Sequence, residues 1–220
     1  MKELTVRYAA FIFGLYLLSL AISLIVTSSL GTTPISSFNY VLSLTTPLTL
    51  GMATFSFNVA IIFVQLWLIR GGVGTRKDRI EILMQIPFSF LFSAFIDINM
   101  MLLSPIHPDS YPMRLAILLA GCLVQAVAVV IELRSNVVIM SAEGVVKYAA
   151  RRYNKDFGAL KVRFDILLVV LAVGYSLLAS GTVQGVREGT LIAAALTGYL
   201  VTFIVVHVVN PLHLHRRLFE

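Results

Sequence analysis

Residues 8–30 read YAAFIFGLYLLSLAISLIVTSSL, an apolar stretch without a charged side chain. About 20 apolar residues are enough for a helix to cross the hydrocarbon core of a bilayer. The stretch is longer than the apolar core of a signal peptide, which has about 7–15 residues, and it has a counterpart later in the chain. It therefore predicts a membrane-spanning helix that is retained in the mature protein.

Five further apolar segments follow, at roughly residues 51–69, 82–103, 113–133, 164–180 and 190–210. The 220-residue chain is 58% hydrophobic and only 13% charged, whereas soluble domains carry about 25% charged residues. We therefore expect an all-α polytopic membrane protein with six transmembrane helices in a single membrane domain, residues 1–220. The net charge of +6 is then explained by cytoplasmic loops, and no nucleic acid partner is expected.

The second half of the chain repeats the spacing of the first half without a gap, so that Arg7 falls on Arg114. Ten identities between residues 7 and 100 are little more than chance, but the apolar segments and the breaks between them also coincide. Each half holds three spans, an odd number, so the two halves would enter the membrane in opposite orientations. This predicts two inverted three-helix repeats, residues 7–103 and 114–210, an architecture found mainly in transporters and channels.

The positive charges lie almost entirely on one side of the predicted spans. Only Arg114 and Arg187 fall on the other side, out of 17 Lys and Arg residues. Because cytoplasmic loops are rich in Lys and Arg, both termini are predicted to be cytoplasmic.

The break after the first span holds the uncharged segment Gly31-Thr32-Thr33-Pro34-Ile35-Ser36. A threonine can cap a helix and Pro34 suits its first position, so a short helix is expected to follow. It is too short to cross the membrane, and it is either re-entrant, with its N–H groups facing the interior, or an interfacial connector. The matching segment of the second half, Ser141–Tyr153, predicts a basic helix.

The candidate substrate-binding residues are the polar side chains near these breaks. Glu188, at the start of the sixth span, is the most informative, because a carboxylate at membrane depth tends to mark an ion or substrate path. It would be the proton-linked or cation-binding group, or alternatively an ordinary acid at an interfacial helix start. The full set is Thr32, Thr33, Pro34, Ser36, Asn39, Asn58, Glu188 and Thr190.

Other residues inside the spans have structural explanations. The amides of Asn58, Gln65, Gln85 and Gln125 are expected to bond between helices, and Asn58 with its repeat counterpart Asp165 forms a second candidate pair for the pathway. Water is expected to reach two residues near the end of the third span, Asp97 and Asn99. Close helix contacts are expected at Gly14, Gly121, Gly174 and Gly198.

The basic helix carries Lys147, Arg151 and Arg152 between apolar residues. Such a helix suits the anionic cytoplasmic leaflet, so these three side chains are candidate contacts for anionic lipid. Alternatively, the helix is a gate beside the substrate exit.

Two motifs resemble those of a known family. Residues 30–34, LGTTP, followed by a short helix, look like the glycine–threonine/serine–proline motif of the YczE/YyaS/YitT group of bacterial membrane proteins, and residues 187–192, REGTLI, resemble its EGT element. The resemblance implies the fold, a transporter role and a location in a bacterial inner membrane. Many relatives carry Trp-Asp after the proline where Ile35 and Ser36 stand here, so no role of that acidic residue is carried over.

No phosphate-binding loop, metalloprotease motif or nucleophile elbow is present, so we expect neither an enzyme nor a bound cofactor or metal. The leading hypothesis is a small secondary transporter or exporter of a small solute or ion. The alternatives are a channel, and a membrane scaffold that binds a partner through the basic loop 141–163. A homodimer would also be compatible with only six spans.

Overall fold

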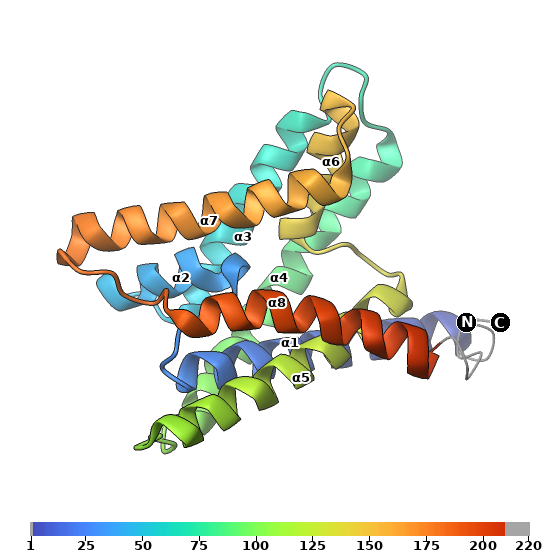
Figure 1. The fold of residues 1–220 in the computed structure, drawn as a ribbon. Coiled ribbons are helices and arrows are strands. Elements are labelled where there is room, and N and C mark those ends of the chain that lie inside the picture. The colour runs from blue at the N-terminus through green and yellow to red at the C-terminus, as the bar shows by residue number, and fades with distance from the viewer. Residues whose placement is uncertain (1, 210–220) are drawn as a thin grey trace. The chain divides into compact units, whose positions relative to one another are not determined.

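The computed structural model describes residues 2–209 of the chain. This part contains eight α-helices followed by one π-helix and no β-strand (Figure 1). The elements are α1 (Lys2–Thr27), α2 (Pro34–Thr45), α3 (Leu50–Leu68), α4 (Arg76–Leu103), α5 (Tyr111–Ser135), α6 (Ser141–Tyr153), α7 (Phe157–Ser180), α8 (Glu188–Ile204) and η1 (Val205–Val209).

Six helical segments of the described part are long and apolar enough to cross a membrane. They coincide with the six predicted spans, and α2 and α6 coincide with the two predicted short helices. The chain is therefore an all-α, multi-pass membrane protein. Residue 210, where the sixth span was predicted to end, lies outside the described residues.

Three spans, α1, α4 and α7, begin about two turns before the apolar stretch that predicted them, and capping residues account for the starts of α4 and α7. At the start of α4, the Thr75 amide donates to Asp78 Oδ2 at 2.7 Å and the Asp78 amide donates to Thr75 Oγ1 at 3.3 Å. At the start of α7, Asp156 accepts a hydrogen bond from the Ala159 amide at 2.8 Å. The capping residues set these helix starts, whereas hydropathy detects only the apolar part of each helix.

The helices form two compact units, and each is described by itself. Unit 1 comprises residues 1–33, 98–137 and 187–220, and it contains α1, α5, α8 and the end of α4. Unit 2 comprises residues 34–97 and 138–186, and it contains α2, α3, α6, α7 and α4 up to Asp97. Each unit therefore takes helices from both halves of the sequence.

In unit 1, α5 packs against both α1 and α8 (Figure 1). A Cβ atom at Gly121 would lie 2.6 Å from Ile25, and one at Gly14 would lie 3.3 Å from Ile131, so both glycines mark close contacts between α1 and α5 as expected. The same expectation is wrong for Gly174 and Gly198, which lie on exposed helix faces. A Cβ atom added at either glycine would have no atom of the described residues within 4 Å.

Polar bonds between helices also occur in unit 1. The Thr197 hydroxyl donates to Gln125 Oε1 at 3.3 Å, as expected for an amide inside a span. The Asn99 amide donates to the Ser19 hydroxyl at 2.8 Å, and Asn99 is 1% exposed. The expectation that water reaches Asn99 is therefore wrong, because α1 covers this residue and supplies its partner.

In unit 2, α2 packs against α7 and α3, and α6 packs against α3 and α7 (Figure 1). The ring of Phe38 on α2 contacts the rings of Phe57 on α3 and Tyr175 on α7, with centroids 5.9 and 6.0 Å away. The outer surface of α7 is apolar and exposed, as expected for a helix surrounded by lipid chains, with Val162, Ile166, Leu167 and Val170 each more than 50% exposed.

Candidate functional site

A row of polar side chains runs along one face of α4. Gln85, Ser89, Ser93 and Asp97 are spaced four residues apart, which places them above one another on a helix. Gln85 and Ser89 are fully buried, Ser93 is nearly so, and Asp97 is partly buried. We call these four residues the α4 polar row. Its four-residue spacing is readable in the sequence, but two serines among the apolar residues of a span do not by themselves indicate a site.

At one end of the row, Gln85 pairs with Gln65 of α3. The Gln65 Nε2 donates to Gln85 Oε1 at 2.8 Å, and the Gln85 Nε2 donates to Gln65 Oε1 at 3.0 Å. The Gln65 Nε2 also donates to the backbone oxygen of Ser141 at 3.1 Å. A Cβ atom at Gly144 would lie only 2.6 Å from Gln65 Oε1, so the glycine lets α6 approach this pair closely.

Replacing either glutamine of this pair with leucine is expected to lower the free energy of unfolding by about 1–3 kcal/mol, because the remaining amide stays buried without its partner. The double variant should be less destabilised than the two single variants added together. Unfolding in mixed detergent micelles measures all four proteins. Strict additivity would contradict a direct interaction between the two side chains.

In the middle of the row, Ser89 meets the start of α6. The Ser89 and Ser141 hydroxyl oxygens lie 3.3 Å apart. The side chain of Met140, which precedes α6, accepts no hydrogen bond from the first amides of the helix. One turn further along α4, the buried Ser93 Oγ has no hydrogen-bond partner within the described residues.

At the other end of the row, Asp97 caps α3. Its carboxylate accepts hydrogen bonds from the Thr49 hydroxyl and the Gly51 amide, both at 2.8 Å. These bonds satisfy donors at the start of α3. The row therefore connects α4 with the start of α3 and the start of α6.

The short helix α2 brings further buried polar groups to unit 2. Ser36 is 5% exposed, Asn39 is 2% exposed and Asn58, on α3, is 7% exposed. The Asn39 Oδ1 atom is buried without a hydrogen-bond partner among the described residues. These side chains belong to the predicted set, together with Pro34 at the first position of α2.

Sequence reasoning missed one acidic residue, Glu143, in the first turn of α6. It is partly buried and lies near the ion pair in which Lys161 Nζ contacts Asp165 Oδ1 at 2.6 Å. Burial raises the pKa of the Glu143 carboxyl above its ordinary value, and Lys161 opposes this shift. Glu143 was overlooked because its segment is strongly basic, although the repeat offset places it on Ser36.

In unit 1, the segment after α1 crosses the start of α8. The Gly189 amide donates to the Leu30 oxygen at 2.8 Å, and the Thr32 amide donates to the Thr190 hydroxyl oxygen at 3.3 Å. A Cβ atom at Gly189 would lie 2.6 Å from the Leu30 oxygen, and Gly31 has φ of +121°, so both positions require glycine. The crossing brings Thr32 and Thr190 together as two of the predicted site residues.

The remaining predicted residues are placed differently. Thr33 is buried in unit 1, whereas Glu188 is exposed. The Glu188 Oε1 atom lies 3.3 Å from Nη2 of its neighbour Arg187, whose Nη1 donates to the Ser29 oxygen at 3.2 Å. Glu188 is therefore held beside a cation at the surface of its own unit.

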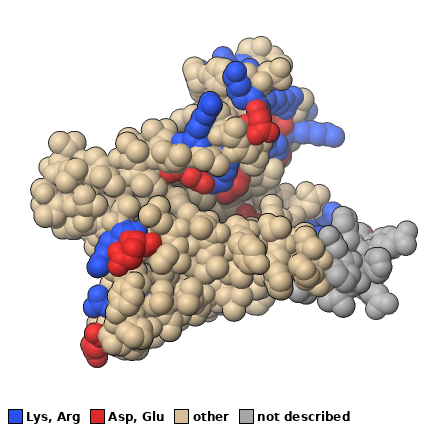
Figure 2. All heavy atoms as spheres, in the orientation of Figure 1, with Lys and Arg blue, Asp and Glu red and all other residues tan. Residues whose placement is uncertain are grey.

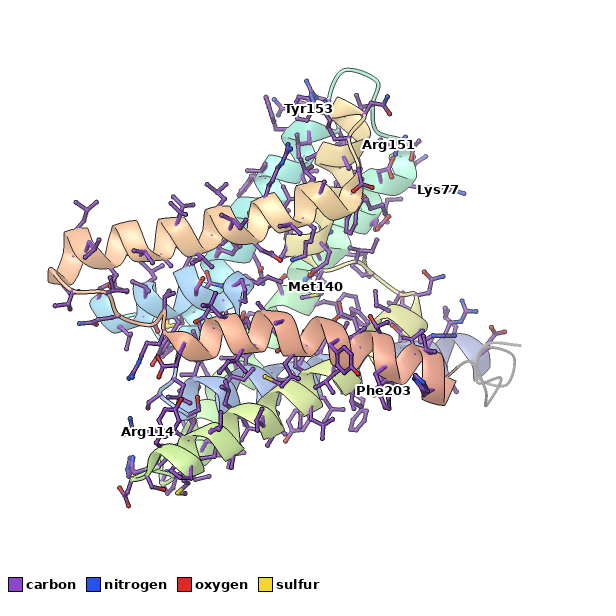
Figure 3. The ribbon with its side chains drawn as sticks, viewed as in Figure 1. Lys77, Arg114, Met140, Arg151, Tyr153 and Phe203 are labelled. Atoms are coloured by element: carbon purple, nitrogen blue, oxygen red, sulfur yellow. The ribbon has the colours of Figure 1, made fainter. Side chains whose placement is uncertain are left out.

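The three basic side chains of α6 form ion pairs or hydrogen bonds within unit 2. Lys147 Nζ lies 2.8 Å from Glu81, Arg151 lies 3.0 Å from Asp78, and Arg152 donates to backbone oxygens including that of Leu68 at 2.9 Å. Figure 2 shows Lys, Arg, Asp and Glu side chains gathered at one end of unit 2, where Figure 3 labels Arg151 and Lys77. The three predicted lipid contacts thus bind protein groups in this structure.

One protein-family model matches nearly all of the described helices. A family model of unknown function, DUF6198, matches residues 5–205. The chain belongs to the DUF6198 family. The matched range contains both short helices, the α4 polar row and Glu143. No curated protein and no solved structure matches the chain.

Within residues 2–209, this DUF6198 member has no group of three or more His, Cys, Asp or Glu side chains that could hold a metal ion. Its single cysteine, Cys122, is buried in unit 1. Unit 2 offers buried hydroxyl and amide groups, together with the carboxylates of Asp97 and Glu143, and three other acids, Asp78, Glu81 and Asp165, are held in ion pairs.

Proposed function

We propose that the protein is a small secondary transporter or exporter of a small solute, working by alternating access between two inverted repeats. The observation that carries this proposal is the α4 polar row. Polar groups are costly inside a membrane span, and those that are kept there commonly line a path for a substrate or ion. Here the row contacts α3 at both ends and the start of the short helix α6 at Ser89, and Ser93 Oγ has no partner among the described residues.

The packing of the helices supports the inverted repeat. The offset between Arg7 and Arg114 maps α2 onto α6 and α3 onto α7. Exchanging the two halves therefore turns the contact between α2 and α7 into the contact between α6 and α3. The same exchange replaces α1 by α5, the helix against which α1 packs. A two-fold relation between the halves requires this exchange of helix pairs.

We assign the pathway to the buried polar groups of the two short helices and the spans beside them. In this assignment α2 and α6 are re-entrant, and their first turns offer free backbone N–H groups. Ser93 Oγ and Asn39 Oδ1, which have no partner among the described residues, are available to hydrogen-bond a solute. Within unit 2, this assignment adds Ser93 and Glu143 to four predicted residues: Pro34, Ser36, Asn39 and Asn58. The other four predicted residues, Thr32, Thr33, Glu188 and Thr190, belong to unit 1 and stay a separate prediction.

The chemistry of the row limits the solute. The row offers hydroxyl groups, an amide and the carboxylate of Asp97, and it contains no cation. A neutral polar or cationic solute suits the row itself better than an anion, because the Asp97 carboxylate repels an anion. Glu143, with its raised pKa, is the group in unit 2 that is best suited to carry a coupling proton.

The sequence supports a membrane location and an orientation for this transporter. The resemblance of the LGTTP and REGTLI motifs to the YczE/YyaS/YitT group supports a transporter in a bacterial inner membrane, and the distribution of Lys and Arg supports cytoplasmic termini. A homodimer is compatible with this arrangement.

A ligand screen tests the proposal. The purified protein in detergent is heated with a panel of metabolites and ions at two pH values. At least one solute is expected to raise the melting temperature in a saturable way, because a ligand that binds only the folded state stabilises it. Ser93→Val should lose this shift, whereas Ser56→Val, on an exposed face of α3, should keep it.

Two results would contradict the transporter assignment. One is a well-folded protein that no small solute stabilises, and the other is a stabilising solute that the protein does not move across a liposome membrane. Either result would favour the scaffold hypothesis, in which the basic loop 141–163 binds a partner.

A further inference from the structure

An apolar groove lies between α6 and α7, within unit 2. Its volume is about 260 Å³. Four residues of each helix line it: Val145, Val146, Ala149 and Tyr153 from α6, with Leu160, Arg163, Phe164 and Leu167 from α7. Arg163 is the only charged residue among these eight.

The groove opens on a surface of the kind that faces lipid. Tyr153, Arg163 and Leu167 are exposed at its edges, and Figure 3 labels Tyr153 at the end of α6. The neighbouring exposed residues of α7, Val162 and Ile166, are large and apolar. Such side chains are stable on the outside of a membrane protein when acyl chains cover them.

Arg163 places a positive charge in the lining of the groove. Its side chain is exposed and forms no ion pair or hydrogen bond within residues 2–209. The nearby acids are engaged, since Asp165 pairs with Lys161 and Asp156 accepts a bond from Ala159. A guanidinium group binds phosphate oxygens through two parallel hydrogen bonds, so the free cation complements a lipid phosphate.

We propose that this groove binds an anionic phospholipid, with one acyl chain between α6 and α7 and the headgroup phosphate at Arg163. The site differs from the lipid contacts expected from sequence. Lys147, Arg151 and Arg152 are engaged with protein groups, and the groove is lined instead by apolar residues of α6. The proposal does not depend on whether the protein transports a solute.

Lipid titration of the delipidated protein tests the proposal. Dioleoyl phosphatidylglycerol, dioleoyl phosphatidylcholine or inorganic phosphate is added to the protein in detergent, and the melting temperature is recorded. Phosphatidylglycerol is expected to stabilise the protein at lower concentrations than phosphatidylcholine. Inorganic phosphate should have no effect, because it lacks an acyl chain.

Two variants examine the two parts of the site. Arg163→Gln should raise the phosphatidylglycerol concentration at half-maximal stabilisation by about tenfold or more, since a charge-assisted bond is lost. Ala149→Phe fills the groove without changing the charge and should have a similar effect. Lys77→Gln, which removes an exposed cation at the start of α4, is the control and should behave like the wild type.

The amount of phosphatidylglycerol that stays bound, measured by native mass spectrometry, provides a second readout that does not depend on melting. Equal lipid binding by Arg163→Gln, Ala149→Phe and the wild type would overturn the proposal. Stabilisation by inorganic phosphate alone would also overturn it, by indicating a simple anion site. A wild-type dimer that Ala149→Phe converts to a monomer would instead assign the groove to a second copy of the chain.

Discussion

Gly51→Ala is expected to lower the free energy of unfolding by about 1–3 kcal/mol, the usual cost of overpacking. The new Cβ atom would lie 2.3 Å from the backbone oxygen of Ser93 and 2.6 Å from the Asp97 carboxylate. Because α4 would have to move away from α3, the hydrogen bond from the Gly51 amide to Asp97 would weaken as well. Thermal unfolding in detergent measures the effect.

The control for this prediction is Gly174→Ala. Gly174 lies inside α7, and no atom of the described residues is within 4 Å of its Cβ position. Alanine favours a helix over glycine by about 1 kcal/mol, so this variant should be as stable as the wild type or more stable. Equal melting temperatures for Gly51→Ala and Gly174→Ala would refute the close approach of α3 and α4.

Glu143→Gln is expected to abolish proton-coupled transport in liposomes, on the proposal that Glu143 carries the coupling proton. Glutamine keeps the size and polarity of the side chain but cannot bind or release a proton. The expectation rests on the partial burial of Glu143 beside Lys161 and Asp165 in the first turn of α6. The measurement is solute uptake driven by a pH gradient across the liposome membrane.

The same variant should change how stability depends on pH. Because the pKa of Glu143 is raised in the folded state, its carboxyl is neutral in both states at low pH and costs nothing there. As the pH rises from about 4.3, the ordinary glutamate value, through the raised pKa, the folded protein loses stability. Glu143→Gln should remove this loss, so its melting temperature relative to the wild type should rise with pH.

Glu188→Gln is the matched comparison, because Glu188 is the group that sequence alone favoured for coupling. It is exposed beside Arg187, so the structure favours Glu143 for this role. Glu188→Gln is therefore expected to keep proton-driven uptake. If uptake is lost in Glu188→Gln and normal in Glu143→Gln, the coupling role belongs to Glu188.

Several contacts in this protein could not be predicted from the sequence. Lys147, Arg151 and Arg152 looked like a basic surface for lipid, because a helical pattern does not reveal which side chains lie opposite. In unit 2, acids and backbone oxygens from α3 and α4 take up these cations. Asn99 was expected to be wet for the same reason, since its partner Ser19 is far away in the chain.

The amino-acid sequence by itself determined the six spans, the two short helices and the membrane class. Hydropathy, helix length and breaks such as Pro34 are local properties, and each acts within a few turns of the chain. Only the tertiary structure decided which polar groups are buried together. The pairing of Gln65 with Gln85, the contact of Ser89 with Ser141 and the environment of Glu143 depend on which helices pack against one another, and packing is a property of the whole fold.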